Sequence, residues 1–304
     1  GDNQDSSGFI KVIKKFMSAV TRIFHFLARM PLPLMQRLGA VLGWVVWCLS
    51  PSYRRNFKAN VQAAGVAWRD ARPAVAAIGA MVAELPWVWM RPHAAKLDGL
   101  MAWDGAEHFE AAMKAGKGAI IMSPHIGSWE IGAQAIAEKF GPTYGPMVAL
   151  FRPARKAWLE PLVANARTRP YLDSAPTSLA GVRTLIRALR NGGYTAILPD
   201  QVPPLGQGVW APFFGRDVYT MTLLAKLAQQ TGAQVIMTWC ERLPAGQGFC
   251  MHMRPFDAPE MTDVSVSPEV AAAAVNRGVE RMVLDAPGQY LWGYARDKQP
   301  RAEG

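Results

Sequence analysis

The stretch Gly118-Ala119-Ile120-Ile121-Met122-Ser123-Pro124-His125-Ile126-Gly127-Ser128-Trp129-Glu130 decides how this chain folds. Its first five residues are a short apolar run, which predicts a buried strand. Pro124 disfavours helix at the residue before it and ends that strand. Ser128 is a favourable N-cap for a helix over 129–140, with Gly141-Pro142 as its stop. We therefore expect a strand, an exposed loop and a helix, with His125 on the loop.

His125 and Glu130 are the candidate acid–base pair of this loop. On one continuous helix, residues five apart lie about 140° apart around the axis and do not face each other. A loop that turns into a helix removes this obstacle, and the helix dipole favours an anionic Glu130 in the first turn. Such a carboxylate can hold the tautomer of a histidine base and stabilise its imidazolium form. The alternative is that Glu130 only caps the N-terminus of the helix and that His125 is an unrelated surface residue.

The rest of the chain alternates strands with helices. Apolar runs predict strands at 147–151 and 194–198, and two further strands, 235–240 and 249–253, are expected to pair across a turn rich in proline and glycine. Helical periodicity predicts helices at about 105–115, 179–191 and 220–230, and a last helix that Ser267-Pro268 opens and Ala286-Pro287-Gly288 closes. This order indicates an α/β domain with a mostly parallel sheet covered by helices.

The N-terminal part has a different pattern, which predicts helices associated with a membrane. Residues 9–30 combine helical apolar periodicity with lysine and arginine, as in a basic amphipathic helix on a membrane surface, although an ordinary core-packing helix has the same pattern. Residues 34–49 follow with Arg37 as their only charge; the uncharged part is shorter than the ~20 residues that a span needs, which favours a buried or interfacial helix. Residues 52–97 are expected to be mostly helical, with breaks at Pro73, Pro86 and Pro92. We expect a tail with membrane-associated helices over 1–50 and an α/β domain over 51–304.

The composition narrows the class of protein. Half of the 304 residues are hydrophobic, only 18% are charged, and the net charge is +10. A basic and apolar chain suits an anionic membrane surface, and the sequence contains no nucleic-acid-binding module. Neither the three cysteines nor the five histidines show metal-ligand spacing, so we expect free thiols, no metal and no cofactor.

Two further polar segments follow predicted strands. Asp200-Gln201 comes directly after the strand at 194–198, where open α/β sheets place ligands, and His125 has the same placement after its own strand. The two positions can therefore share one cleft. Arg152 also follows an apolar run and suits a bidentate grip on phosphate or carboxylate. The alternatives are a turn-forming Asp200 among prolines and a solvated Arg152 on a loop.

Several segments resemble one protein family in its own order. The His125–Glu130 segment resembles the HxxxxD/E signature of the lysophospholipid acyltransferase superfamily, in the form found in lipid A biosynthesis acyltransferases (the lauroyl and myristoyl transferases). The other matching segments, which extend the resemblance over roughly 50–296, are Gly116-Lys117-Gly118, Phe151-Arg152-Pro153, Leu198-Pro199-Asp200-Gln201, Gly208-Val209-Trp210-Ala211-Pro212-Phe213-Phe214-Gly215 and Gln289-Tyr290-Leu291-Trp292.

The resemblance implies an enzyme of the cytoplasmic face of the cell inner membrane. It would move a fatty acyl chain from an acyl carrier protein (or acyl-CoA) to a hydroxyl of a lipid A precursor, without metal or enzyme nucleophile. His125 and Glu130 would be catalytic, and Arg152, Asp200 and Gln201 would bind substrate. A phosphatidyl-sugar or lysolipid acceptor, or a non-catalytic membrane-binding protein on the same scaffold, remain the alternatives.

Overall fold

The computed structural model describes residues 19–302 except 152–159, 161–162, 164–165 and 167. Seven strands form the main sheet in the order β1-β9-β8-β2-β5-β3-β4. Their bounds are β1 Met101–Asp104, β2 Ala119–Met122, β3 Met147–Phe151, β4 Leu172–Pro176, β5 Tyr194–Ile197, β8 Gln234–Arg242 and β9 Phe249–Pro255. All neighbours pair in parallel except β8 and β9, which form the antiparallel pair predicted across residues 244–248. The predicted fold class, α/β with a mostly parallel sheet, is confirmed.

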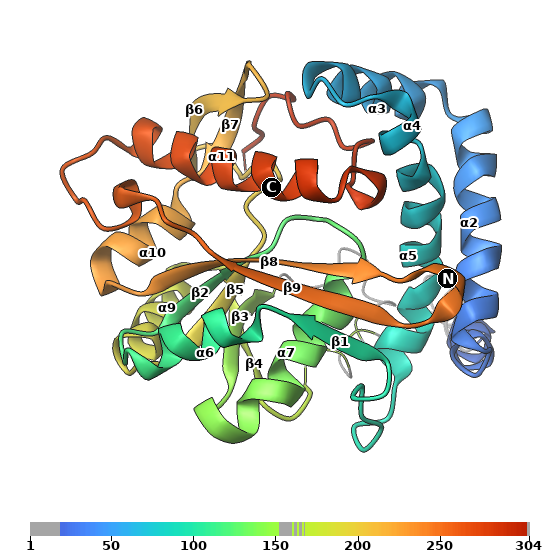
Figure 1. Cartoon of the computed structure of the whole chain (residues 1–304), viewed down its shortest axis with the longest axis horizontal. Coiled ribbons are helices and arrows are strands. Elements are labelled where there is room, and N and C mark those ends of the chain that lie inside the picture. The colour runs from blue at the N-terminus through green and yellow to red at the C-terminus, as the bar shows by residue number, and fades with distance from the viewer. Residues whose placement is uncertain (1–18, 152–159, 161–162, 164–165, 167, 303–304) are drawn as a thin grey trace, which may run out of the picture.

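Helices cover both faces of this sheet. They are α2 Leu32–Leu49, α3 Pro51–Ala63, α4 Trp68–Ala71, α5 Pro73–Met90, α6 Ala106–Lys114, α7 Trp129–Tyr144, α9 Leu179–Arg190, α10 Leu223–Thr231 and α11 Pro268–Asp285. Alternation along β2 explains the two layers: Ile120 and Met122 pack into the core that includes α9, α10 and α11, while Ala119 and Ile121 pack into the core under α6 and α7. Figure 1 shows α11 and α6 on opposite sides of the sheet. Because both sides of β2 are covered, its four residues are all buried, as a continuous apolar run predicts.

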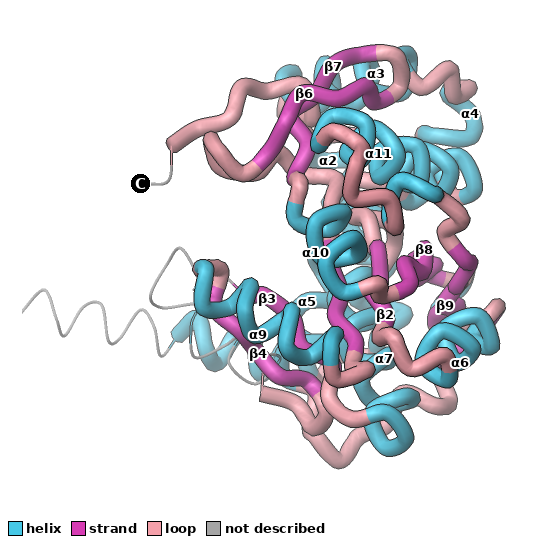
Figure 2. Tube along the Cα trace, turned by 90° about the vertical axis from the view of Figure 1, so that its left-hand side faces the viewer, coloured by secondary structure: helices cyan, strands magenta, loops and turns pink. Residues whose placement is uncertain are grey.

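A second, antiparallel sheet was not predicted. It consists of β6 Gly208–Phe213 and β7 Arg216–Met221. Figure 2 shows this hairpin beside α11. The helix predicted from residue 220 therefore begins only at Leu223, because the preceding residues pair with β6.

Two prolines that were expected to break helices lie inside them. Pro86 is within α5 and Pro142 is within α7, which continues past the predicted stop to Tyr144. A proline inside a helix removes one backbone donor and costs about 3 kcal/mol. Pro86 itself is buried, and burial along both helices offsets this cost. The end of α7 comes instead at Gly145, whose φ of +82° leaves the helical region.

The apolar helices α2 and α5 pack side by side at one end of the sheet (Figure 1). Their contact needs glycine: a Cβ on Gly79 would lie 2.0 Å from the carbonyl oxygen of Gly39 and 2.8 Å from the Cα of Gly43. The backbones can approach this closely only because all three positions lack a side chain.

The outer side of α2 is apolar and exposed. Its exposed large side chains are Leu34, Leu38, Val41, Leu42, Trp44, Val45, Val46 and Leu49. Two helical stretches, Leu32–Leu49 and Trp68–Met90, are long and apolar enough to cross a membrane by length and composition, and they are 28% and 44% buried. The expectation was a buried or interfacial helix: one face of α2 is buried against α5, and the other is apolar and exposed, so an interfacial position stays a prediction. Of the predicted basic helix at 9–30, residues up to 18 lie outside the described part, and Ala19–Ala28 is helical.

Candidate active site

His125 lies on the loop between β2 and α7, as predicted, but the expectation of an exposed loop is wrong: Ile126 and Ser128 are buried and His125 is only partly exposed. Backbone hydrogen bonds hold this loop from two sides: the amides of Gly127 and Ser128 donate to the carbonyls of Gln289 (2.9 Å) and Cys240 (2.9 Å), and the amide of Leu291 donates to the carbonyl of His125 (3.1 Å). Gly127 has a φ of +63°, and a Cβ there would lie 2.0 Å from the Cys240 carbonyl oxygen. The loop is therefore a fixed turn, and the path of its backbone requires a glycine.

Asp200 is the observed partner of His125. β2 and β5 are parallel neighbours with Met122 opposite Ile197, so the residues after their carboxyl ends meet. The Nδ1 atom of His125 lies 2.7 Å from Oδ1 of Asp200, and the backbone amide of His125 donates to Oδ2 at 2.9 Å. Both carboxylate oxygens thus fix the same residue. The two residues are thus in direct contact, and a shared substrate cleft stays a prediction.

The electrostatic environment favours an ionised Asp200. Burial by itself raises the pKa of this carboxyl, but the charge of His125, the two hydrogen bonds from His125 and the charge of Arg296 outweigh burial, so the Asp200 pKa lies below its ordinary value. Arg296 is itself buried, and its guanidinium donates to the Tyr219 carbonyl and to Thr220 Oγ1. Sequence reasoning did not identify Arg296, because a single arginine near the chain end has no local pattern that marks it as buried.

The second ring nitrogen of His125, Nε2, faces an amide. An ionised Asp200 accepts the proton on Nδ1, which leaves the lone pair on Nε2. The Nε2 amide of Gln201 lies 3.2 Å from this nitrogen and can donate to it. The His125 side chain is 13% exposed whereas that of Asp200 is 2% exposed, so the imidazole is partly accessible from solvent and its carboxylate partner is buried. The centroids of the Trp129 ring and the imidazole lie 4.8 Å apart in an edge-to-face arrangement, and this packing limits rotation of the imidazole.

The predicted roles of Glu130, Asp200 and Arg152 agree with the structure to different extents. Glu130 lies in the first turn of α7, as expected. The orienting contact on Nδ1 that we had assigned to Glu130 is made by Asp200, and a catalytic role for Glu130 stays a prediction. Direct substrate binding by Asp200 also stays a prediction, one that its burial disfavours. Arg152 lies outside the described residues.

Ser128 occupies the predicted N-cap position of α7, but its side chain makes no capping hydrogen bond. Its hydroxyl donates to Oε2 of Glu84 at 2.8 Å and accepts from Nη2 of Arg242 at 2.6 Å. Glu84, 1% exposed, belongs to the apolar helix α5. A single carboxylate in an otherwise apolar helix is the sequence signal from which this cluster was recognisable.

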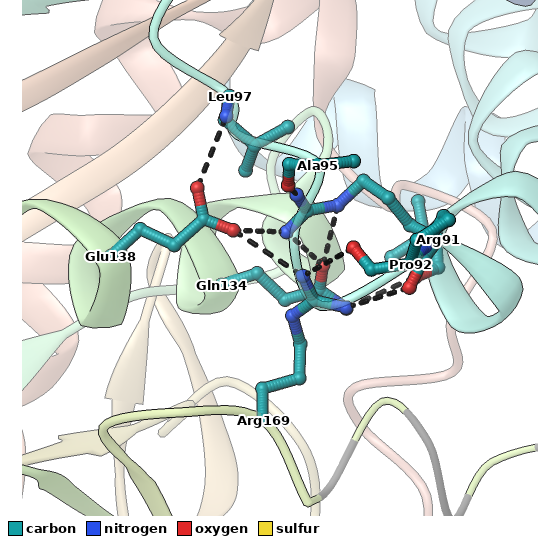
Figure 3. A network of polar contacts seen from close by, with 8 residues as sticks. Arg91, Pro92, Ala95, Leu97, Gln134, Glu138 and Arg169 are labelled. Carbon is teal, nitrogen blue, oxygen red and sulfur yellow. Dashed lines mark hydrogen bonds and ion pairs between the residues drawn. The ribbon is translucent and has the colours of Figure 1, made fainter.

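A second buried ionic cluster holds α7 farther along the helix (Figure 3). Arg91, at the end of α5, and Arg169 both donate to the carboxylate of Glu138 on α7. Arg91 also donates to Gln134 at 2.9 Å, and Arg169 to the carbonyl of Arg91 at 2.9 Å. Burial, together with the nearby charge of Arg91, lowers the pKa of Arg169 below its ordinary value. The cluster ties α5 and α7 to the chain before β4.

No group of three or more His, Cys, Asp or Glu side chains within the described ranges could hold a metal ion. Cys48, Cys240 and Cys250 are free thiols, as expected. The site brings together the imidazole of His125 on the fixed loop and, from the chain after β5, the buried carboxylate of Asp200 and the amide of Gln201.

Curated proteins with similar sequences include several acyltransferases. A lipid A biosynthesis acyltransferase of Haemophilus influenzae is 32% identical over 190 residues, which cover 62% of this chain and 56% of that protein. A lipid A biosynthesis lauroyltransferase of Escherichia coli K12 is 26% identical over 228 residues, covering 75% and 70%. A phosphatidylinositol mannoside acyltransferase of Mycobacterium tuberculosis is 27% identical over 195 residues, covering 63% and 56%. The chain thus matches a little over half of the first and third of these relatives.

The family comparison covers nearly the whole chain. The sequence model for bacterial lipid A biosynthesis acyltransferases matches residues 7–298, which include the loop at His125, Asp200-Gln201, the β6–β7 hairpin and the buried C-terminal segment. This chain belongs to the bacterial lipid A biosynthesis acyltransferase family.

Proposed function

We propose that this protein transfers a fatty acyl group from a thioester donor to a hydroxyl of a lipid A precursor, with His125 as the general base. The observation that carries the proposal is the geometry around the imidazole: Nδ1 of His125 lies 2.7 Å from Oδ1 of the buried Asp200, whose pKa is lowered, and the His125 side chain is 13% exposed. Family membership adds the class of reaction.

The chemistry needs no nucleophile from the enzyme. His125 Nε2 removes the proton of the acceptor hydroxyl as its oxygen attacks the thioester carbonyl. The tetrahedral intermediate then expels the thiolate, and the imidazolium returns the proton to the leaving sulfur. A new ester C–O bond forms, the C–S bond breaks, and the base is regenerated. General-base assistance of this kind is worth about 10²–10⁴ in rate. Asp200 stabilises the transient imidazolium, because an ionised carboxylate lies 2.7 Å from Nδ1.

We assign the neighbouring polar groups as follows. Gln201 donates to Nε2 in the absence of substrate and gives way to the acceptor hydroxyl, after which its amide can hydrogen-bond the acceptor. Glu130, anionic at the start of α7, adds negative charge near the imidazolium. Arg152 binds an anionic group of the acceptor through its guanidinium.

The net positive charge and the exposed apolar side of α2 support an acidic acyl donor and an anionic membrane as partners of this chain. The net charge of +10 favours an acidic carrier protein as the acyl donor and an anionic bilayer surface, since opposite charge steers association. The exposed apolar side of α2 is the part that enters the bilayer, at the cytoplasmic face of the inner membrane. Acyl-CoA is the alternative donor, and an assay with both donors at equal concentration separates the two.

One observation favours a second acceptor. The similarity to a mycobacterial phosphatidylinositol mannoside acyltransferase indicates that the same scaffold supports transfer to a phosphatidyl-sugar. The His125 chemistry is the same for either acceptor, because both react through an alcohol hydroxyl.

The test is mass spectrometry of the lipid A fraction from cells with and without this protein. We expect the loss of a species heavier by one acyl chain and the accumulation of its precursor. An unchanged lipid A profile together with a changed phosphatidyl-sugar profile would favour the second acceptor, and no change in any lipid class would contradict acyl transfer.

A further inference from the structure

Glu84 is the most unusual charge in the described part of the fold. It lies in the otherwise apolar helix α5 and is 1% exposed. Four donors reach its carboxylate: Gln36 Nε2 at 2.8 Å, Ser128 Oγ at 2.8 Å, and the Nε and Nη2 atoms of Arg242 at 2.5 and 2.7 Å. The guanidinium therefore binds both carboxylate oxygens in the bidentate geometry that arginine prefers.

Stability alone does not account for this buried pair. The desolvation of two charges offsets most of their attraction, and apolar residues of similar volume are often equally stable in such a position. Ser128 also forgoes its capping hydrogen bond at α7, a contact typically worth about 1 kcal/mol, in order to bind Glu84 and Arg242. What the pair provides instead is a fixed position for the segments around it.

Those segments enclose the loop that carries His125. Ser128 ends that loop, directly after Gly127, whose amide is held by the carbonyl of Gln289. The side chain of Gln289 in turn binds the backbone of Arg242 twice, accepting from its amide at 2.8 Å and donating to its carbonyl at 2.9 Å. The ion pair, Ser128 and Gln289 thus form one connected hydrogen-bond network (the frame), which holds the loop that carries His125. Gln36 extends this frame to α2.

We propose that Glu84 and Arg242 are positioning residues, which set the loop through Ser128 and Gln289 so that Nδ1 of His125 meets Asp200 and Nε2 faces the substrate. This role rests on the proposed function, in which His125 is the base. Neither residue touches substrate. Their effect is to keep the imidazole within the narrow range of positions from which proton transfer occurs, and a misplacement of the order of 1 Å can cost about 10²-fold in rate.

The experiment uses two complementary variants of the full chain. Glu84→Met combined with Arg242→Met removes both charges at similar volume, so the core stays filled. Ser128→Ala keeps the ion pair and removes its side-chain link to the loop, while the link through Gln289 is retained. The matched control replaces Glu260 and Arg277 by methionine, since this ion pair (2.6 Å) joins the segment before α11 to α11 and does not contact the loop.

Two measurements are made on each variant. Steady-state kinetics should show kcat lower by about 10- to 100-fold for the double variant and about 3- to 10-fold for Ser128→Ala, with KM for the acceptor within about twofold. Nitrogen-15 NMR of the His125 ring, assigned with His125→Asn, should show that the Nδ1-protonated tautomer of the wild type is no longer the single form. The control should match the wild type in both.

The outcomes separate this proposal from the proposed function. Wild-type kcat and wild-type ring signals in both folded variants would overturn the positioning role and leave His125 catalysis intact. A wild-type protein without acyl transfer would overturn the proposed function, while the ring signals would still decide whether the frame sets the tautomer. If the double variant fails to fold, Ser128→Ala decides the question, because its ion pair is retained.

Discussion

Replacing Asp200 by asparagine removes the charge beside His125 and keeps the volume. The asparagine oxygen can still accept from the His125 backbone amide, which in the wild type donates to Oδ2 at 2.9 Å. Its NH2 group then faces Nδ1 and donates to it, so the ring proton moves to Nε2. An Nε2–H cannot accept the proton of a hydroxyl. The substitution therefore converts the base into its inactive tautomer without emptying the site.

The magnitude follows from two losses, the tautomer and the charge that stabilises the imidazolium. Together they remove the general-base contribution, about 10²–10⁴ in kcat, which corresponds to about 3–5 kcal/mol in the activation free energy. The assay measures the acylated lipid by mass spectrometry under saturating donor and acceptor. Asp285→Asn, at an exposed carboxylate on α11, is the matched control and should leave kcat unchanged. Activity of Asp200→Asn within about threefold of the wild type, in a folded protein, would refute the assignment of Asp200 and its tautomer argument.

Three further predictions concern stability and the membrane. Because the Asp200 pKa is lowered in the fold, the stability that this carboxylate contributes should be complete above about pH 4, the pKa of the unfolded state, and should be lost as the pH falls through the lower folded pKa. The free energy of unfolding should therefore depend less steeply on acid pH in Asp200→Asn than in the wild type. Parallel curves for the two proteins would contradict this. Gly79→Ala should lower the free energy of unfolding by about 1–3 kcal/mol, since the added Cβ would lie 2.0 Å from a backbone oxygen of α2. Gly99→Ala, which has open space around it, should cost less, and denaturant titration compares the two variants. Leu38→Glu with Val45→Glu on the exposed face of α2 should weaken vesicle binding without changing the melting temperature, and equal sedimentation with vesicles would exclude that face from the membrane contact.

The local sequence around His125 was sufficient to predict the elements that build the site. A short apolar run, Pro124 and the residues from Ser128 onward gave the strand, the loop and the helix start. Asp200 followed another apolar run, and because parallel strands end at the same edge of a sheet, the meeting of the two residues was predictable once both strands were recognised.

The features that could not be predicted from the sequence depend on contacts between residues that are far apart along the chain. Arg242 and Glu84 are 158 positions apart, and no periodicity or motif joins them. The same holds for the choice between Asp200 and Glu130 as the partner of Nδ1, which depends on how β5 sits beside β2. Local rules failed at Pro86 and Pro142 as well, because burial of the surrounding helix outweighs the cost of one missing hydrogen bond.

The most direct test of the account is acyl transfer by purified protein with and without its base. The full chain is incubated in mixed micelles with an acyl carrier protein thioester and a lipid A precursor, and the product is followed by mass spectrometry. We predict that the wild type adds one acyl chain per acceptor, and that His125→Ala, assayed at a temperature where it is folded, binds both substrates but turns over about 10²–10⁴-fold more slowly. A folded His125→Ala variant with turnover within a few-fold of the wild type would remove His125 from the reaction and contradict the mechanism.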